Sequence, residues 1–283
     1  MIDFTIRREN DKYNGRIIWS KDQIHYIITE YENGTTMKEL GRRFNVQYET
    51  IRRLLRKKKV QIDGYKHGYP RKEDVFSEID SREKAYWLGI LYADGKISGN
   101  NRYDISLGLS DKEHIEKFQK FLGAVNHKII VTVPDTGKNK LTKNFYSLSI
   151  RDKKIHDDLI HWGCYPNKSH LDLHIPNIKQ DFIIDFIRGY FDGDGGFWYA
   201  KNKTKKDRLV IAFSGSKTLL QEIASFLHIN TALERNVKAK NTYCLRTSKK
   251  ALVQEIVDRL YKETDESIRL DRKYQIYLDY LGA

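Results

Sequence analysis

The chain has 283 residues and a formal net charge of +13, from 51 Lys plus Arg against 38 Asp plus Glu. Hydrophobic residues make up 40% of it, enough to pack a core, which excludes an intrinsically disordered chain. No apolar run approaches the roughly 20 residues of a membrane span, and no signal-peptide pattern is visible. Two cysteines cannot build a disulfide framework or a zinc site by themselves. We therefore expect a cytoplasmic protein, of prokaryotic or phage type, whose basic charge attracts a polyanion such as nucleic acid.

Residues 1–60 predict a small all-α domain of the helix-turn-helix kind. A capped helix after Ser20, a short helix over 37–44, a turn at Asn45 and a basic helix over 47–58 are the parts of this motif. The stretch resembles the resolvase-type helix-turn-helix family. The resemblance implies that base edges are read by Gln47, Tyr48 and Thr50, and that phosphates are bound by Arg52, Arg53 and Arg56.

The remainder of the chain predicts a linker followed by two repeats. Residues 61–80 read as the linker, because Gly, Lys and Tyr are frequent near its start and Pro70 interrupts it. Beyond it, AYWLGILYADGKI (Ala85–Ile97) aligns without gaps with DFIRGYFDGDGGF (Asp185–Phe197) at an offset of 100 residues. In each copy the apolar helix is followed by two hairpins that alternate with two helices. The order αββαββα predicts an α+β fold of pseudo-twofold repeats over 81–170 and 181–283, connected by 171–180.

Each apolar helix carries two small residues four positions apart, which are Gly89 and Ala93 in the first copy and Gly189 and Gly193 in the second. This spacing places them on one helix face, where they let two helix backbones approach closely. Packing on these faces would bring Asp94 and Asp194 together at the same end of the helix seam. Because adjacent carboxylates repel and helix C-termini favour a cation, the pattern predicts a divalent metal site that faces a polyanion. Leu in place of Gly189 should disrupt the seam, and Ala should be milder.

The motifs WLGILYADG (Trp87–Gly95) and IRGYFDGDG (Ile187–Gly195) resemble the LAGLIDADG signature. From residue 81 to about residue 281 the chain is similar to a two-repeat, single-chain LAGLIDADG homing endonuclease. The resemblance implies a DNA-binding saddle of antiparallel sheets with the two motif helices as its seam. It implies that Mg²⁺, for which Mn²⁺ or Ca²⁺ can substitute in binding, is held by Asp94, Asp194 and the backbone carbonyls of Ala93 and Gly193.

The resemblance implies two further kinds of catalytic residue. A polar residue after the first hairpin orders water near the metal in the family, and the matching positions here are Asp111 and Ser216. A basic residue near the end of each repeat supports the transition state. Lys168 matches in the first repeat and Lys273 in the second, with Arg272 as the other candidate.

Basic residues gather in the predicted hairpin loops, as expected for a sheet that faces DNA. With Tyr103, they are Arg102, Lys138, Lys140, Lys143, Lys201, Lys203, Lys205, Lys206, Arg208, Arg235, Lys238 and Lys240.

These features predict a monomeric, site-specific double-stranded DNA endonuclease whose internal repeat supplies the pseudo-twofold and whose helix-turn-helix extends a long, asymmetric target. A transcription regulator that kept the fold and lost cleavage is the alternative, because the carboxylate of Asp111 and the short hydroxyl of Ser216 are unusual at the water-ordering positions. An RNA maturase is a third interpretation. The helix-turn-helix argues against it, since side chains cannot read the narrow major groove of A-form RNA.

Overall fold

The computed structural model describes residues 2–8, 17–33, 35–60, 71–99, 102–134, 142–200, 208–236 and 241–282. The chain divides into two compact units, Met1–Arg71 with Gly123–His127, and Lys72–Leu122 with Lys128–Ala283. Among the described helices, none combines the length and apolarity that crossing a bilayer requires.

The first unit is built on three helices, α1 (Lys21–Glu32), α2 (Met37–Arg43) and α3 (Tyr48–Lys57). Ser20 and Gln23 form a capping box that starts α1. Asn45, with a φ of 50°, makes the tight turn between α2 and α3, a conformation that Asn adopts more readily than most residues. Ile27 of α1 and Leu40 of α2 are fully buried in the apolar cluster that joins the helices. The predicted helix-turn-helix arrangement is confirmed.

This unit is not entirely helical, so the all-α expectation is wrong in one detail. β1 (Arg7–Arg8) pairs antiparallel with β2 (Ile17–Ile18). The N-terminal segment is held by Gln23, whose buried side-chain amide donates to the backbone oxygens of Asp3 at 2.8 Å and Thr5 at 3.0 Å. A buried amide needs such partners, and the extended backbone supplies them.

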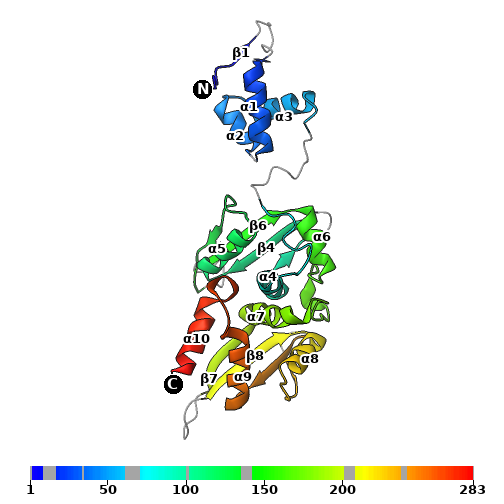
Figure 1. Cartoon of the computed structure of the whole chain (residues 1–283), viewed down its shortest axis with the longest axis vertical. Helices are drawn as coiled ribbons and strands as arrows, with labels where there is room; N and C mark the ends of the chain where they lie inside the picture. Colours follow the sequence, from blue (N-terminus) through cyan, green and yellow to red (C-terminus); the bar gives the residue numbers. More distant parts are fainter. Residues whose placement is uncertain are drawn as a thin grey trace. The chain divides into compact units, whose positions relative to one another are not determined.

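The second unit contains two copies of the predicted element order (Figure 1). The first copy comprises α4 (Arg82–Ala93), β3 (Lys96–Ile97), β4 (Asp104–Leu109), α5 (Lys112–Phe121), β5 (Ile130–Thr132), β6 (Phe145–Arg151) and α6 (Lys153–His161). The second comprises α7 (Ile183–Asp194), β7 (Gly195–Ala200), β8 (Arg208–Gly215), α8 (Lys217–Phe226), β9 (Glu234–Arg235), β10 (Tyr243–Thr247) and α9 (Lys250–Tyr261). Within the described residues, the strands form two antiparallel sheets in the orders β3-β4-β6-β5 and β7-β8-β10-β9. The predicted α+β fold of tandem repeats is confirmed, and α10 (Asp271–Leu281) is an addition to the predicted order.

The predicted linker over 61–80 is too long at its C-terminal end. Phe76 is fully buried, its ring lies 5.5 Å from that of Phe121, and its carbonyl accepts a hydrogen bond from the indole of Trp162 at 2.7 Å. Val75 and Ile79 are buried as well. Three apolar side chains in a short irregular stretch make no periodic pattern, which is why composition alone suggested a linker. Residues 61–70 lie outside the described part of the chain.

Helices α4 and α7 pack against each other (Figure 1). Their contact lies at the small residues. A Cβ atom added to Gly89 would lie 2.1 Å from the backbone oxygen of Phe186, and one added to Gly189 would lie 2.0 Å from that of Tyr86. No side chain fits in such a space, so the two helices meet backbone against backbone only because both residues are Gly.

Replacing Gly189 with Ala is expected to lower the free energy of unfolding by about 2 kcal/mol or more. Overpacking against a rigid backbone outweighs the roughly 1 kcal/mol that Ala gains in helix propensity, so the mild effect expected from the sequence does not follow from this contact. Gly196→Ala is the matched control, because nothing lies within 4 Å of a Cβ added there. Thermal unfolding compares the two, and a Gly189→Ala chain as stable as Gly196→Ala would show that the helices do not meet at this point.

Candidate metal centre and DNA interface

The seam between α4 and α7 ends at two aspartates. Asp94 caps the C-terminus of α4, and Asp194 is the last residue of α7. The helix ends are close, because a Cβ added to Gly193 would lie 2.3 Å from the Cβ of Ala93 and 2.9 Å from Oδ2 of Asp94. Both aspartates are exposed to solvent, although protein surrounds most of each carboxylate. Two carboxylates therefore share one end of the seam, where a ligand can reach them from outside.

The electrostatics of this pair favour a positively charged ligand. Surrounding protein excludes water from part of the Asp194 carboxylate and the charge of Asp94 repels it, which raises the pKa of Asp194 to about 6. Partial exclusion of water also raises the pKa of Asp94, and Lys168 and Lys273 oppose both shifts. Neither carboxylate accepts a hydrogen bond from any residue that the structure describes. A cation between them would relieve a repulsion that the protein compensates only in part.

The donor set fits a hard divalent cation. Within the described ranges, no group of three or more His, Cys, Asp or Glu side chains could hold a metal, so two carboxylates would be the side-chain ligands. The last carbonyls of an α-helix have no partner inside the helix, which leaves those of Ala93 and Gly193 at the right ends. Mg²⁺ commonly binds through one or two carboxylates, several waters and substrate phosphate oxygens. The residues present are compatible with that kind of site.

Two lysines bind the C-terminal ends of the motif helices. Each donates from Nζ to backbone oxygens that lie 100 positions apart in the two repeats: Lys168 to Leu91 at 2.7 Å and to Gly95, and Lys273 to Phe191 and to Gly195 at 2.7 Å. These shared acceptors make Lys273, rather than Arg272, the pseudo-symmetric equivalent of Lys168. Burial lowers the pKa of both lysines, that of Lys273 to about 8, so Lys273 is largely protonated at pH 7.

The two predicted water-ordering residues are engaged by other protein groups. Asp111, the residue before α5, accepts hydrogen bonds from Nε of Arg272 at 3.1 and 3.0 Å. Ser216, the residue before α8, is buried, accepts from the N–H of Leu173 at 2.9 Å and donates to its carbonyl at 3.3 Å. Each of these side chains holds another segment of the chain, and the expectation that they order water beside a metal stays a prediction.

The predicted DNA-contacting residues of the sheets are only partly described. Those that are described and exposed lie at or next to strand ends, and they are Arg102, Lys143, Arg208 and Arg235. Tyr103 is half-buried, with its ring 5.3 Å from that of His156. The remainder lie outside the described residues: Lys138, Lys140, Lys201, Lys203, Lys205, Lys206, Lys238 and Lys240.

In the first unit, a hollow of about 1590 Å³ lies along α2 and α3. Four of the predicted DNA-contacting residues line it: Gln47, Tyr48, Thr50 and Arg53. Lys38, Arg42, Lys57 and Lys58 add positive charge to the same surface. Arg52 and Arg56 are not among its lining residues, and Arg52 pairs with Glu49 on its own helix at 2.9 Å.

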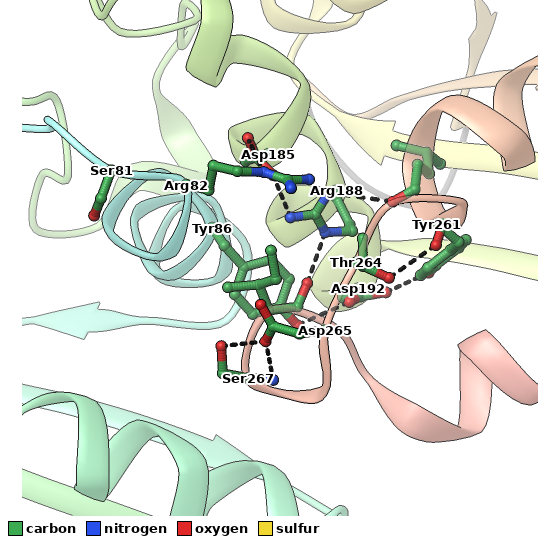
Figure 2. Close-up of polar contacts among 12 residues, drawn as sticks. Ser81, Arg82, Tyr86, Asp185, Arg188, Asp192, Tyr261, Thr264, Asp265 and Ser267 are labelled. Carbon is green, nitrogen blue, oxygen red and sulfur yellow. Dashed lines mark hydrogen bonds and ion pairs between the residues drawn. The ribbon is translucent and has the colours of Figure 1, made fainter.

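A buried polar network on α7 is absent from the sequence predictions. Asp185 and Arg188 form an ion pair, and both are fully buried (Figure 2). Asp192, also buried, accepts from the hydroxyls of Tyr86 at 2.8 Å and Tyr261 at 2.5 Å. The available signal was three charged residues, three and four positions apart, on an otherwise apolar helix, because charges at such positions are almost never buried unless they are paired.

Family comparisons agree with this geometry. Residues 181–261 match the model of the LAGLIDADG-like domain, and residues 20–61 match that of the CENP-B N-terminal DNA-binding domain. The second repeat is therefore similar to a LAGLIDADG-like domain, and the N-terminal helices are similar to a DNA-binding domain of the helix-turn-helix type. The predicted resemblances are confirmed, with the CENP-B domain as the matching family where the sequence suggested the resolvase type.

Two proteins of Methanocaldococcus jannaschii are similar in sequence. An uncharacterized protein is 25% identical over 200 residues, which is 68% of this chain and 73% of that protein. The DNA-directed RNA polymerase subunit Rpo1C is 26% identical over 161 residues, which is 56% of this chain and 17% of the subunit. The chain thus spans less than a fifth of the polymerase subunit that it matches.

Solved structures with a similar arrangement include two meganucleases. I-SmaMI bound to uncleaveable DNA is 14% identical, with a TM-score of 0.49 over 71% of this chain and 90% of that one. The LAGLIDADG meganuclease I-CpaMI bound to uncleaved DNA is 13% identical, with a TM-score of 0.47 over 70% and 89%. Both TM-scores lie below 0.5, so the fold is established by the helices and strands of this chain and not by these similarities.

Asp194 is expected to titrate near pH 6 in the metal-free chain, and Asp94→Asn is expected to lower that value because it removes the repelling charge. Since the folded pKa lies above the ordinary value, this group favours the fold at low pH, and that contribution is lost as the pH rises through about 6. Carboxyl ¹³C NMR follows the titration, with Asp157→Asn as the control on an exposed carboxylate of α6. An Asp194 that titrates near pH 4 in both chains would contradict the coupling.

Proposed function

We propose that this chain is a site-specific double-stranded DNA endonuclease that hydrolyses phosphodiester bonds with a divalent metal. The observation that carries the proposal is the pair of exposed carboxylates, Asp94 and Asp194, at the ends of two helices in backbone contact. No described residue donates a hydrogen bond to them, and a lysine binds each helix end beside them. The match of residues 181–261 to the LAGLIDADG-like domain supports it.

The residues of the centre divide the chemistry between them. Asp94 and Asp194 would hold Mg²⁺, which would supply a Lewis acid and lower the pKa of a bound water. Lys168 and Lys273 would supply positive charge near the phosphate, which gains negative charge in the transition state. Exposed cations at the strand ends, such as Arg102 and Arg208, would neutralise the DNA backbone. Because two repeats in one chain present a matching pair of lysines and aspartates, a monomer suffices to cut both strands.

The helix-turn-helix would extend the target beyond the part that the repeats contact. Its hollow gathers Gln47 and Tyr48 at the start of α3 with several cations, the combination of base readers and phosphate contacts that a recognition helix uses. Two repeats with different surface residues and one helix-turn-helix suit a long, asymmetric DNA site.

A DNA-binding regulator without cleavage activity is the second candidate. The observation that favours it is that Asp111 and Ser216 both bind other parts of the protein, at the positions expected to order water. The intact pair Asp94 and Asp194 favours the nuclease.

Incubation with Mg²⁺ and the DNA that flanks the gene of this protein tests the proposal, and cleavage of both strands at one site is the expected result. Asp94→Asn or Asp194→Asn should lower the cleavage rate by about a hundredfold or more while DNA binding in Ca²⁺ persists, because a direct ligand matters at least as much as the residues that support ligands. Asp157→Asn should cut as wild type does. If either aspartate variant cut DNA at the wild-type rate, the proposed roles of Asp94 and Asp194 would be wrong.

Arg53→Ala should weaken binding to duplex DNA of any sequence and reduce the slope of log affinity against log salt by about 1, as the loss of one phosphate contact predicts. Arg43→Ala is the matched control, because Arg43 lies outside the hollow and pairs with Glu30 at 2.7 Å. Fluorescence anisotropy across a salt series measures both slopes. Equal slopes for the two variants would place the DNA elsewhere on this unit.

A further inference from the structure

The segment that carries Lys273 is held in place by α7. Arg188 donates from Nε to the carbonyl of Ile268 at 2.6 Å, and Asp192 accepts from the N–H of Leu270 at 2.8 Å. Lys273 closes the contact by donating to the carbonyl of Asp192 at 3.0 Å. Arg188 and Asp192, which Figure 2 shows on α7, are both buried. These bonds therefore fix the path of the chain as it enters α10.

The first repeat holds the same segment from the other side. Asp111, at the start of α5, binds the guanidinium of Arg272. Lys117, also on α5, pairs with Asp271 at 2.6 Å. Arg272 and Asp271 are the two residues that immediately precede Lys273. The lysine of the second centre is therefore tied to a helix of the first repeat.

A mirrored contact exists in the other repeat. Ser216, at the start of α8, binds the backbone of Leu173, and Asp172 accepts from the N–H of Thr218 at 3.0 Å and from its hydroxyl at 2.6 Å. Leu173 and Asp172 follow Lys168 in the chain. In each repeat, the start of the helix after the first hairpin thus binds the segment that follows or precedes the lysine of the other centre. Asp111 and Ser216 are at equivalent positions in these two contacts.

The two sides differ in how directly the lysine is held. In the first repeat, Lys168 begins a 3₁₀ turn that ends at His170, and the residues held by the other repeat, Asp172 and Leu173, come only after it. In the second repeat, the residue held by the other repeat is Arg272, which directly precedes Lys273. In addition, the three charged residues of the buried network on α7 align with uncharged residues of α4, which are Ala85, Leu88 and Tyr92. The buried contacts that hold the segment before Lys273 therefore have no counterpart on α4. Lys273 is therefore the lysine whose immediate neighbour in the chain is held by the opposite repeat.

We propose that Asp111 and Arg272 are positioning residues, and that through their ion pair the first repeat sets the place of Lys273 in the second centre. The catalytic consequence rests on the proposed nuclease function, whereas the placement of Lys273 does not. The second centre is then complete only when the first repeat is folded beside it, which couples the cutting of one strand to the integrity of the other half of the protein.

Lysine labelling of the full, metal-free chain tests the placement. Reductive methylation with formaldehyde should leave Lys273 and Lys168 protected, since both bind backbone oxygens. Asp111→Arg and Arg272→Asp each place like charges together and should raise labelling of Lys273 about fivefold, the scale of a partly exposed ion pair. Lys168 should not change and is the internal reference. The double variant should restore protection to within about twofold.

A matched control separates the ion pair from charge alone. Glu116→Arg makes the same charge change on the neighbouring helix α5, but Glu116 pairs with Lys112 of its own helix at 2.8 Å. It should leave Lys273 protected. Thermal midpoints are compared for all variants, and Asp111→Asn serves as the milder variant if a reversal lowers the midpoint.

Cleavage gives the second measurement. On a DNA target that wild type cuts, the single reversals should accumulate nicked product in which one strand is spared, and Lys273→Met should spare the same strand. A displacement of about 1 Å can cost about a hundredfold in rate, so the effect on that strand is expected to be large. Recovery of double-strand cutting in the double variant completes the expected result.

Three outcomes would overturn the proposal: unchanged labelling of Lys273 in the single reversals, no recovery in the double variant, or equal slowing of both strands. In the last case the reversals would act on the protein as a whole and not on the second centre. If wild type cuts no DNA while the labelling pattern appears as expected, the nuclease function fails and the placement of Lys273 stands.

Discussion

The contact between α4 and α7 is the constraint on which the rest of the second unit depends. Gly89 and Gly189 face backbone atoms at distances that no Cβ could occupy, so the helices meet closer than ordinary helices do. Because the pseudo-twofold passes through this contact, whatever stands at the end of one helix stands beside its equivalent on the other. The positions of Asp94 and Asp194 and of the two lysines on the helix ends follow from it.

The two helices of the seam are alike in shape and different in chemistry. α4 is apolar along its buried length, whereas α7 carries a buried ion pair and a buried carboxylate in the same positions. Such groups cost free energy to bury, and apolar replacements of similar size are often as stable. Their partners lie on α4, on α9 and in the segment before α10, so the network joins these parts of the chain and defines the path that leads into α10. The asymmetry of this network is the physical basis for treating the two centres as unequal.

Much of the fold and of the aspartate pair could be predicted from the sequence, because both depend on periodic patterns and on the internal repeat. The offset of 100 residues, the Asp-Gly helix ends and the basic third helix of the first unit each follow from local patterns that the structure preserves. The choice between Arg272 and Lys273 could not be made, because it depends on which side chain reaches the carbonyl of Gly195. The contacts of Asp111 and Ser216 were also beyond reach, since their partners lie far along the chain and neither pair forms a periodic pattern. The burial of Phe76 was missed for the same reason.

Two carboxylates on one turn of α7 show how the fold separates structure from chemistry. Asp192 receives hydrogen bonds from two tyrosine hydroxyls and from the N–H of Leu270, and it is buried. Asp194, two residues later, receives none from the described residues and stays exposed. A carboxylate whose oxygens already accept hydrogen bonds from the protein binds an added ligand weakly. A carboxylate without such bonds, beside another negative charge, gains free energy when it binds a cation. The helix therefore uses the first aspartate to hold the chain that bears Lys273 and presents the second, together with Asp94, to whatever approaches the end of the seam.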